Sequence, residues 1–401
     1  MIGHHPYHLH KLQFTEISEI YTSETIKTFA YSLIGIFLPI YLLQNGVSLQ
    51  SLFILFILIN VFRFFLELPV GHLIARFGAK HVMAISYPLS FLYIALLAVY
   101  PSYPTPLYII AALWAIADSL HWVAYQSLFS KAKSKGKSGR QIGLMGILSI
   151  SIGALVPLLG GYIAAKFGLQ AVFMIAPILL LIAMVPLFQS METVRSKRLN
   201  FSGLVPTVRR DMVAHAALSF DVVAGMVLWP LFIFMAVQDY FKLGLLVSLS
   251  FIPSLIAFWF AGRISDTMSK KRTLAVGAGG LFVVNAFRAA VTGYWSAFGV
   301  HALGVIVGPL LSIPLYSIFY SHADRTRRIE YTVVLEMAAD ASRALTFALL
   351  LGISLIASQQ NVLRAGFVMA AIAILATNVV QLKLRHKRPG LRSVPAAGGI
   401  R

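Results

Sequence analysis

The sequence predicts an all-α polytopic membrane protein with twelve transmembrane helices in two pseudo-symmetric six-helix bundles. The apolar composition, the regular series of long apolar runs and a polar segment that occurs twice predict this fold class. The 401 residues are 58% hydrophobic and 12% charged, with a mean hydropathy of +0.80, whereas globular domains are about 45–50% apolar and about 25% charged. A soluble fold could not bury that much apolar surface, so the chain requires a lipid bilayer around it.

The apolar runs define the predicted spans, because about 18 or more mostly apolar residues suffice to cross a bilayer as a helix. These runs cover 22–44, 48–70, 81–100, 105–130, 141–165, 169–190, 211–236, 241–261, 273–293, 296–320, 331–357 and 362–383. The long middle connection predicts an N-terminal bundle at 22–190, a cytoplasmic basic linker at 191–210 and a C-terminal bundle at 211–385. Residues 1–21 form a cytoplasmic segment in which Leu9, Leu12, Ile17 and Ile20 could build an interfacial helix. Residues 386–401 are expected to be a disordered basic cytoplasmic tail.

The net charge of +19 first suggests a nucleic-acid partner, but the distribution of the charges excludes that interpretation. Lys and Arg gather in alternate connections, for example at 131–140, 195–210 and 270–272, while the intervening connections hold only Lys166, Lys242 and Arg364. Cytoplasmic loops of membrane proteins collect such residues. The pattern predicts a multi-pass protein of the inner or plasma membrane with both termini cytoplasmic and the lipid bilayer, not nucleic acid, as its partner.

The sequence predicts no metal site and no cofactor. His4, His5, His8 and His10 hint at metal binding, but a solvated histidine-rich tail is the favoured interpretation. The chain has no cysteine and no Gly-x-x-x-x-Gly-Lys-Ser/Thr loop for ATP. Energy for any transport is therefore expected from a proton gradient or another ion gradient, from a partner, or from the gradient of the solute itself.

Two similar polar segments follow the second apolar run of each half, "GHLIARFGAK" at 71–80 and "GRISDTMSKK" at 262–271. They resemble the Gly-x-Leu-x-Asp-Arg-x-Gly-Arg-Lys turn of the major facilitator superfamily (MFS). The first copy matches at Gly71, Leu73, Arg76, Gly78 and Lys80, with Ala75 in the place of the acid; the second retains Gly262, Asp266, Lys270 and Lys271, with Ser269 in the place of a glycine. Internal repetition by halves is common in secondary transporters.

A second resemblance lies in the fifth run, "GALVPLLGGYIAAKFG" at 153–168, which is similar to a Gly/Pro signature of the same family. Its matching residues are Gly153, Pro157, Gly160 and Gly161, with Val156 replacing a glycine. Small residues let helices approach closely. The "ELPVG" lead-in at 67–71 also fits, and the resemblance extends from about 20 to 385.

The resemblance implies a cytoplasmic gate between the two bundles. By the pseudo-symmetry of the family, Asp266 would meet the start of the fifth span near Arg140. Because the first copy lacks its acid, Glu330 is expected to cap the eleventh span and attract Arg76 or Lys80. The alternative is that these basic turns only set the membrane topology.

Charged residues inside the spans are costly and tend to be functional. Asp118 and His121 share one face of the fourth span with Trp114 and Tyr125, Asp221 lies in the seventh, and Glu336, Asp340 and Arg343 form a stripe on the eleventh. The resemblance implies that the fourth and seventh spans line a central pathway and that the eleventh lies at the seam beside it. These six residues are the predicted proton-coupling and pathway residues, because burial favours the neutral form of a carboxyl group and histidine titrates near neutral pH.

Two ion pairs have a static alternative. Arg63 and Glu67, one turn apart on the second span near the inner surface, are predicted to be a structural pair whose charges cancel. Asp340 and Arg343 could form a similar pair. Arg288 and His301 in the outer parts of the ninth and tenth spans could be interface anchors or an outer gate.

These features predict a secondary active transporter, not an enzyme, that moves a small organic solute by alternating access. Proton coupling is expected, with efflux slightly favoured over uptake because of the Gly/Pro signature. We expect a monomer. The alternatives are a transporter-like sensor, which the lost acid at Ala75 would favour, and a membrane-embedded lipid-handling enzyme on the same scaffold.

Overall fold

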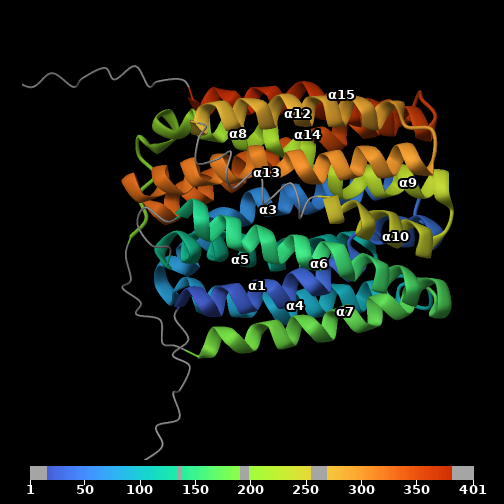
Figure 1. The fold of residues 1–401 in the computed structure, drawn as a ribbon. Helices are drawn as coiled ribbons and strands as arrows, with labels where there is room; N and C mark the ends of the chain where they lie inside the picture. The colour runs from blue at the N-terminus through green and yellow to red at the C-terminus, as the bar shows by residue number, and fades with distance from the viewer. Residues whose placement is uncertain (1–15, 133–137, 190–197, 254–268, 382–401) are drawn as a thin grey trace, which may run out of the picture.

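The computed structural model describes residues 16–132, 138–189, 198–253 and 269–381, and these residues are overwhelmingly helical with no strand among them. The long helices run side by side along one axis, with α1, α4 and α7 towards one edge of the bundle and α8, α12 and α15 towards the other (Figure 1). The all-α prediction is confirmed.

The first half of the chain forms α1 (Glu16–Ile34), α2 (Leu38–Gln44), α3 (Leu49–Phe77), α4 (Ala79–Val99), α5 (Leu107–Ala132), α6 (Ser138–Phe167), α7 (Leu169–Met184) and the 3₁₀ turn η1 (Val185–Phe188). Gly78 is the single residue between α3 and α4. Its φ of 91° explains why a glycine occupies this short connection. Together α1 and α2 make one apolar segment long enough to cross a membrane.

The second half forms α8 (Leu204–Val223), the π-helical turn η2 (Ala224–Leu228), α9 (Trp229–Val237), α10 (Tyr240–Ser250), α12 (Lys270–Ala290), α13 (Tyr294–Arg325), α14 (Arg328–Ser354), α15 (Gln359–Ile374) and η3 (Leu375–Gln381). Pro230 accounts for the widened π turn, because it has no N–H to donate to Met226 and its ring would collide with that carbonyl in a regular helix.

Among the described residues, ten helical segments are long and apolar enough to cross a membrane. The two other predicted spans are α14, which is 27 residues long but carries several charges, and α10, an eleven-residue apolar helix whose predicted continuation to 261 lies outside the described residues. The number twelve and the division into bundles at 22–190 and 211–385 therefore stay predictions.

Two predicted boundaries are wrong. Helix α1 begins at Glu16, so Ile17 and Ile20 belong to the first long helix and not to a separate interfacial helix; Leu9 and Leu12 lie outside the described residues. Helix α8 begins at Leu204, so Arg209 and Arg210 lie on its first turns and not in the linker. In both places the helix continues through polar residues beyond the apolar run.

Two pairs of helices make the most extensive contacts between the halves of the chain. Helix α3 packs against α14, and a Cβ atom placed on Gly71 would lie 2.7 Å from the Val333 side chain. Helix α6 packs against α10, and there a Cβ atom on Gly161 would lie 2.6 Å from the Tyr240 carbonyl oxygen. Glycine is required at both positions because the neighbouring helix occupies the space of a side chain.

The other residues of the Gly/Pro signature also face neighbouring helices. Gly153 contacts the Phe251 ring, and a Cβ atom on Gly160 would lie 2.7 Å from the Leu33 carbonyl oxygen. The Pro157 carbonyl oxygen lies against Gly244. The glycines of the signature thus give α6 a surface without side chains, against which α1 and α10 pack closely.

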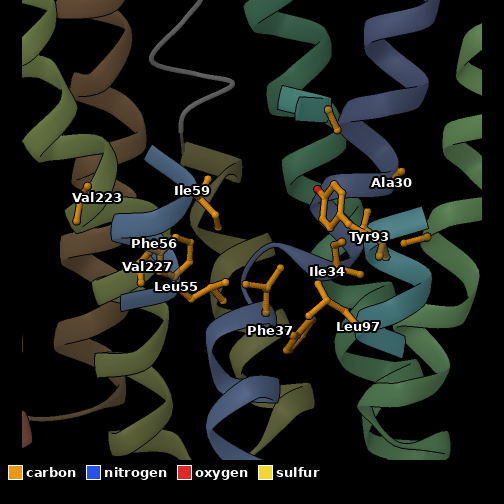
Figure 2. Packing of buried hydrophobic residues seen from close by; sticks show 14 of the residues in the cluster. Ala30, Ile34, Phe37, Leu55, Phe56, Ile59, Tyr93, Leu97, Val223 and Val227 are labelled. Carbon is orange, nitrogen blue, oxygen red and sulfur yellow. The ribbon is translucent and has the colours of Figure 1, made fainter. Parts of the chain in front are cut away.

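A continuous apolar core extends from one half of the chain into the other. Figure 2 shows this cluster with residues from α1 (Ala30, Ile34), α3 (Leu55, Phe56, Ile59) and α4 (Tyr93, Leu97), and with Val223 and Val227 from the second half. Buried polar groups inside such a core require partners, because an unpaired one is costly. The site is built from those groups.

Candidate functional site

Arg63 on α3 is the centre of a buried cluster of charges. The residue is only 4% exposed. Its guanidinium nitrogens lie 3.0 Å from Asp340 Oδ1, 3.1 Å from Asp118 Oδ2, 3.3 Å from Glu336 Oε2 and 3.7 Å from Glu67 Oε1. A guanidinium offers five N–H donors in a planar fork and can serve several carboxylates at once. One cation therefore joins acids from three helices.

The helical period explains how the sequence assembles this cluster. Glu336 and Asp340 lie four residues apart on α14, and Arg63 and Glu67 have the same spacing on α3, so each pair lies on one helix face. The two faces meet where α3 packs against α14, and α5 adds Asp118 from the side. We refer to Arg63, Glu67, Asp118, Glu336, Asp340 and Arg343 as the Arg63 cluster.

Further side chains hold the acids of the Arg63 cluster in place. Arg343 Nη1 lies 2.8 Å from Asp340 Oδ1. The remaining contacts all bring a hydrogen-bond donor or a histidine nitrogen to a carboxylate: Ser119 Oγ to Glu67 at 3.1 Å, Trp114 Nε1 to Asp118 at 3.1 Å, Gln126 Nε2 to Glu336, and His215 Nε2 to Glu336 at 3.3 Å. His215 comes from α8, so a fourth helix reaches the cluster.

The expected structural pair of Arg63 and Glu67 exists, but it is not isolated. Its distance of 3.7 Å is the longest of the four ion pairs of Arg63, and both residues are buried. The sequence places the two residues one turn apart and says nothing about acids on other helices. Asp340 is a similar case: it contacts Arg343 on its own helix and also Arg63 on α3, and the sequence indicates only the first contact.

His121 lies apart from Asp118 although both belong to the predicted face of the fourth span. His121 Nε2 lies 2.7 Å from Glu24 Oε1 on α1, and its Nδ1 is 3.4 Å from Ser86 Oγ on α4. A residue three positions further along a helix points about 60° away. That rotation turns His121 towards α1 while Asp118 faces α3.

Sequence reasoning missed two charged residues of α1, Glu24 and Lys27, which are 6% and 7% exposed. Both lie within the first predicted span, so two charges one turn apart inside an apolar run were the available signal. The Lys27 ammonium lies 4.3 Å from the centroid of the Trp122 ring. It also lies 5.3 Å from the centroid of the Tyr31 ring.

Asp221 forms a separate polar group in the second half. Asn285 Nδ2 donates to Asp221 Oδ1 at 2.7 Å, Arg288 Nη1 donates to Asn285 Oδ1 at 2.9 Å, and Arg288 lies 3.8 Å from Asp221. The Arg288 guanidinium also lies 5.3 Å from the centroid of the Trp229 ring, whose Nε1 donates to His301 Nδ1 at 3.0 Å. Arg288 and His301 are thus connected through Trp229 in one polar network.

The first predicted cytoplasmic turn is only partly as expected. Arg76 is exposed and lies over the Phe77 ring, whereas Lys80 is buried and forms an ion pair with Glu19 of α1. Glu330, at the start of α14, accepts a hydrogen bond from the Asn200 backbone N–H at 3.2 Å. Glu330 was expected to attract Arg76 or Lys80. Lys80 instead forms its ion pair with Glu19, because α1 begins early enough to supply that acid.

Other predicted gate residues cannot be placed in this way. Gly262 and Asp266 lie outside the described residues, as do His4, His5, His8 and His10. Arg140 lies in α6, but its side chain is outside the description. Within the described ranges, no group of three histidine, cysteine, aspartate or glutamate residues is arranged to hold a metal ion.

An apolar cavity of about 170 Å³ lies at the other end of the bundle, between α2 and α9. Its lining includes Ile40, Leu43, Leu231 and Phe234. None of the predicted site residues contributes to it. The polar clusters, not this cavity, are therefore the candidate functional site.

Comparison with known proteins identifies the class. The model of the Major Facilitator Superfamily matches residues 20–347, so this chain belongs to that family of membrane transporters and is a multi-pass membrane protein. It is also 24% identical over 290 residues to the uncharacterized protein YqgE of Bacillus subtilis (strain 168). That match covers 67% of this chain and 65% of the relative, so the chain spans about two thirds of the relative's length.

Proposed function

We propose that this protein is a secondary active transporter that moves a small organic solute across the inner or plasma membrane by alternating access, driven by the proton gradient. The observation that carries the proposal is the imbalance of charge in the Arg63 cluster. Four carboxylates outnumber the two guanidinium groups by two, and the only other titratable side chain in contact with them among the described residues is His215. Bound protons remove that excess at the lowest cost.

The position of the Arg63 cluster supports coupling between protons and movement. Asp340 and Glu336 belong to α14 and Arg63 to α3, so these ion pairs cross between the two halves of the chain. A proton on either acid weakens its attraction to Arg63. The proton load thereby changes the strength of the contact that must alter when the halves rock.

Contacts at both ends of the bundle support an occluded form. At one end the Phe129 and Tyr320 rings of α5 and α13 lie 5.1 Å apart between centroids. At the other end Tyr240 Oη donates to Gln44 Oε1 at 2.6 Å, and α2 packs against α9. Alternating access requires that each set of contacts opens in turn.

The direction, orientation and association state are proposed from the sequence. The Gly/Pro signature of α6 favours export, and the basic connections favour cytoplasmic termini. We propose a monomer in the lipid bilayer, without a nucleic-acid partner, a cofactor or enzymatic activity.

Proton-coupled flux into proteoliposomes tests the proposal. Purified protein is reconstituted with a pH-sensitive dye inside, and naphthalenesulfonate, naphthylmethanol or naphthyltrimethylammonium is added; none of the three carries protons by itself near neutral pH. We expect at least one solute to move protons with the wild-type protein and with Asp324→Asn, a control in an exposed ion pair. Asp118→Asn should abolish the signal. The proposal is contradicted if none of the three solutes triggers proton movement, or if Asp118→Asn leaves the solute-triggered movement unchanged.

A further inference from the structure

Lys27 is a buried cation that forms no direct ion pair with any residue the structure describes. It lies on α1, its side chain is 7% exposed, and its ammonium faces the rings of Trp122 and Tyr31 at 4.3 Å and 5.3 Å. Within the described parts of the chain, Lys27 has no ion pair and no hydrogen bond to another side chain. Aromatic faces attract a cation but do not neutralise it.

The nearby acids are already engaged by other partners. Glu24, one turn before Lys27, has His121 Nε2 at 2.7 Å. Asp118 has Arg63 Nη1 and Trp114 Nε1, both at 3.1 Å. A buried ammonium is costly unless a negative group joins it. No carboxylate among the described residues forms a direct ion pair with Lys27, so an anion from outside the protein would be its first direct partner.

The surroundings of Lys27 suit an apolar body. Trp122, Tyr31 and Tyr125 are each only partly buried although they lie within the bundle. The Trp122 and Tyr125 rings lie edge to face, 5.9 Å between centroids, and Tyr31 Oη hydrogen-bonds Tyr93 Oη at 2.8 Å. Rings in this arrangement offer flat faces and edges against which a planar apolar group can pack.

We propose that Lys27 binds the anionic group of the transported solute, which is an amphipathic organic anion with a carboxylate or sulfonate attached to an apolar or aromatic body. The inference rests on the proposed function and gives it a substrate class. An ammonium is a compact point charge that accepts an oxyanion from several directions. A cationic solute at the same place would meet the like charge of Lys27.

Equilibrium dialysis of the full-length protein in nanodiscs tests this site without any need for transport. The probes are naphthalenesulfonate and naphthyltrimethylammonium, which share a ring system and differ in charge. We expect the wild-type protein to bind the sulfonate about ten- to a hundredfold more tightly than the ammonium compound, as for a charge-assisted hydrogen bond. Lys27→Met should lose that preference, Lys27→Arg should keep most of it, and Lys166→Met, at an exposed lysine, should leave it unchanged.

The inference is overturned if the sulfonate does not bind, if it binds no more tightly than the ammonium compound, or if Lys27→Met binds it like the wild-type protein. Retention of the thermal unfolding midpoint in Lys27→Met separates a lost site from a lost fold. Lys27→Arg gives a second check, because a cation of another shape should restore binding. If the sulfonate binds through Lys27 but its flux ignores the pH gradient, proton coupling fails and the anion site stands.

Discussion

The two most extensive contacts between the halves of the chain differ in chemistry. Where α3 meets α14, Arg63 contacts Glu336 and Asp340 in a buried network of charges. Where α6 meets α10, Gly161 and Gly244 bring backbones into direct contact without any ion pair among the described residues. The attraction in the first contact depends on protonation. In the second it depends on close packing and on a neutral hydrogen bond from the Leu158 backbone N–H to Ser248 Oγ at 2.9 Å.

This difference suggests a division of labour. Close backbone packing changes little with pH or hydration, so the α6–α10 contact can act as a pivot. Ion pairs between α3 and α14 weaken when an acid takes a proton or when water enters. The α3–α14 contact is therefore the one that can switch.

Loss of Arg63 should have the largest effect. Arg63→Met leaves four carboxylates of the cluster without their common cation, and breaking a buried pair in this way costs about 3–5 kcal/mol. We expect a strongly lowered thermal unfolding midpoint in nanodiscs and no transport. The matched control is Arg328→Met, which removes an exposed 2.8 Å pair with Asp324 and should cost at most about 1 kcal/mol. Equal losses in the two variants would contradict the special role of the α3–α14 contact.

Neutralising one acid should separate function from folding. Asp340→Asn removes a charge that contacts Arg63 and Arg343, an interaction of about 1.5–3 kcal/mol that corresponds to about tenfold or more in rate. We expect proton-driven solute flux to fall by at least about tenfold while the protein stays folded. Asp324→Asn provides the same chemical change at an exposed site, and its flux should match the wild type. Undiminished coupling in Asp340→Asn would remove this acid from the mechanism.

Overpacking the glycine contact should destabilise the protein in a way that ignores pH. In Gly161→Ala the new Cβ atom would lie 2.6 Å from the Tyr240 carbonyl oxygen, and such overpacking costs about 1–3 kcal/mol. Gly308→Ala is the control, because nothing lies within 4 Å of its Cβ position. Unfolding measured at acidic and alkaline pH should give the same difference between these variants. A marked change with pH would argue against a charge-independent pivot.

The Asp221 group should give the smallest effect, because it touches neither contact. Asp221→Asn can keep a hydrogen bond with Asn285 while it loses the weaker 3.8 Å pair with Arg288. We expect a loss of about 0.5–1.5 kcal/mol in unfolding free energy. An effect as large as that of Arg63→Met would mean that the second half contains its own switch.

The sequence was sufficient for the helices but not for their side-chain partners. Long apolar runs predict most spans, yet helices α1 and α8 extend into polar residues beyond those runs. Twin polar turns and the α6 glycines predicted the family, which the match over residues 20–347 confirms.

Partners across helices depend on packing that periodicity does not contain. Arg63 and Glu67 were visible as neighbours, but Asp118 and Asp340 reach Arg63 only because α5 and α14 lie beside α3. His121 and Asp118 share a helical stripe and still face different helices. Glu24 and Lys27 lie one turn apart in an apolar run, and this spacing carries no indication of the groups that surround them.

The central claim is that the α3–α14 contact switches with protonation while the α6–α10 contact stays fixed. The chain has no cysteine, so pairs of spin labels can be placed at will. Exposed positions Phe65 and Leu345 report on the first contact, and Leu159 and Leu249 report on the second. On acidification in nanodiscs, the distance between labels should change for the Phe65→Cys/Leu345→Cys pair and stay constant for the Leu159→Cys/Leu249→Cys pair. Equal changes in both pairs, or a constant distance in the first, would contradict the account.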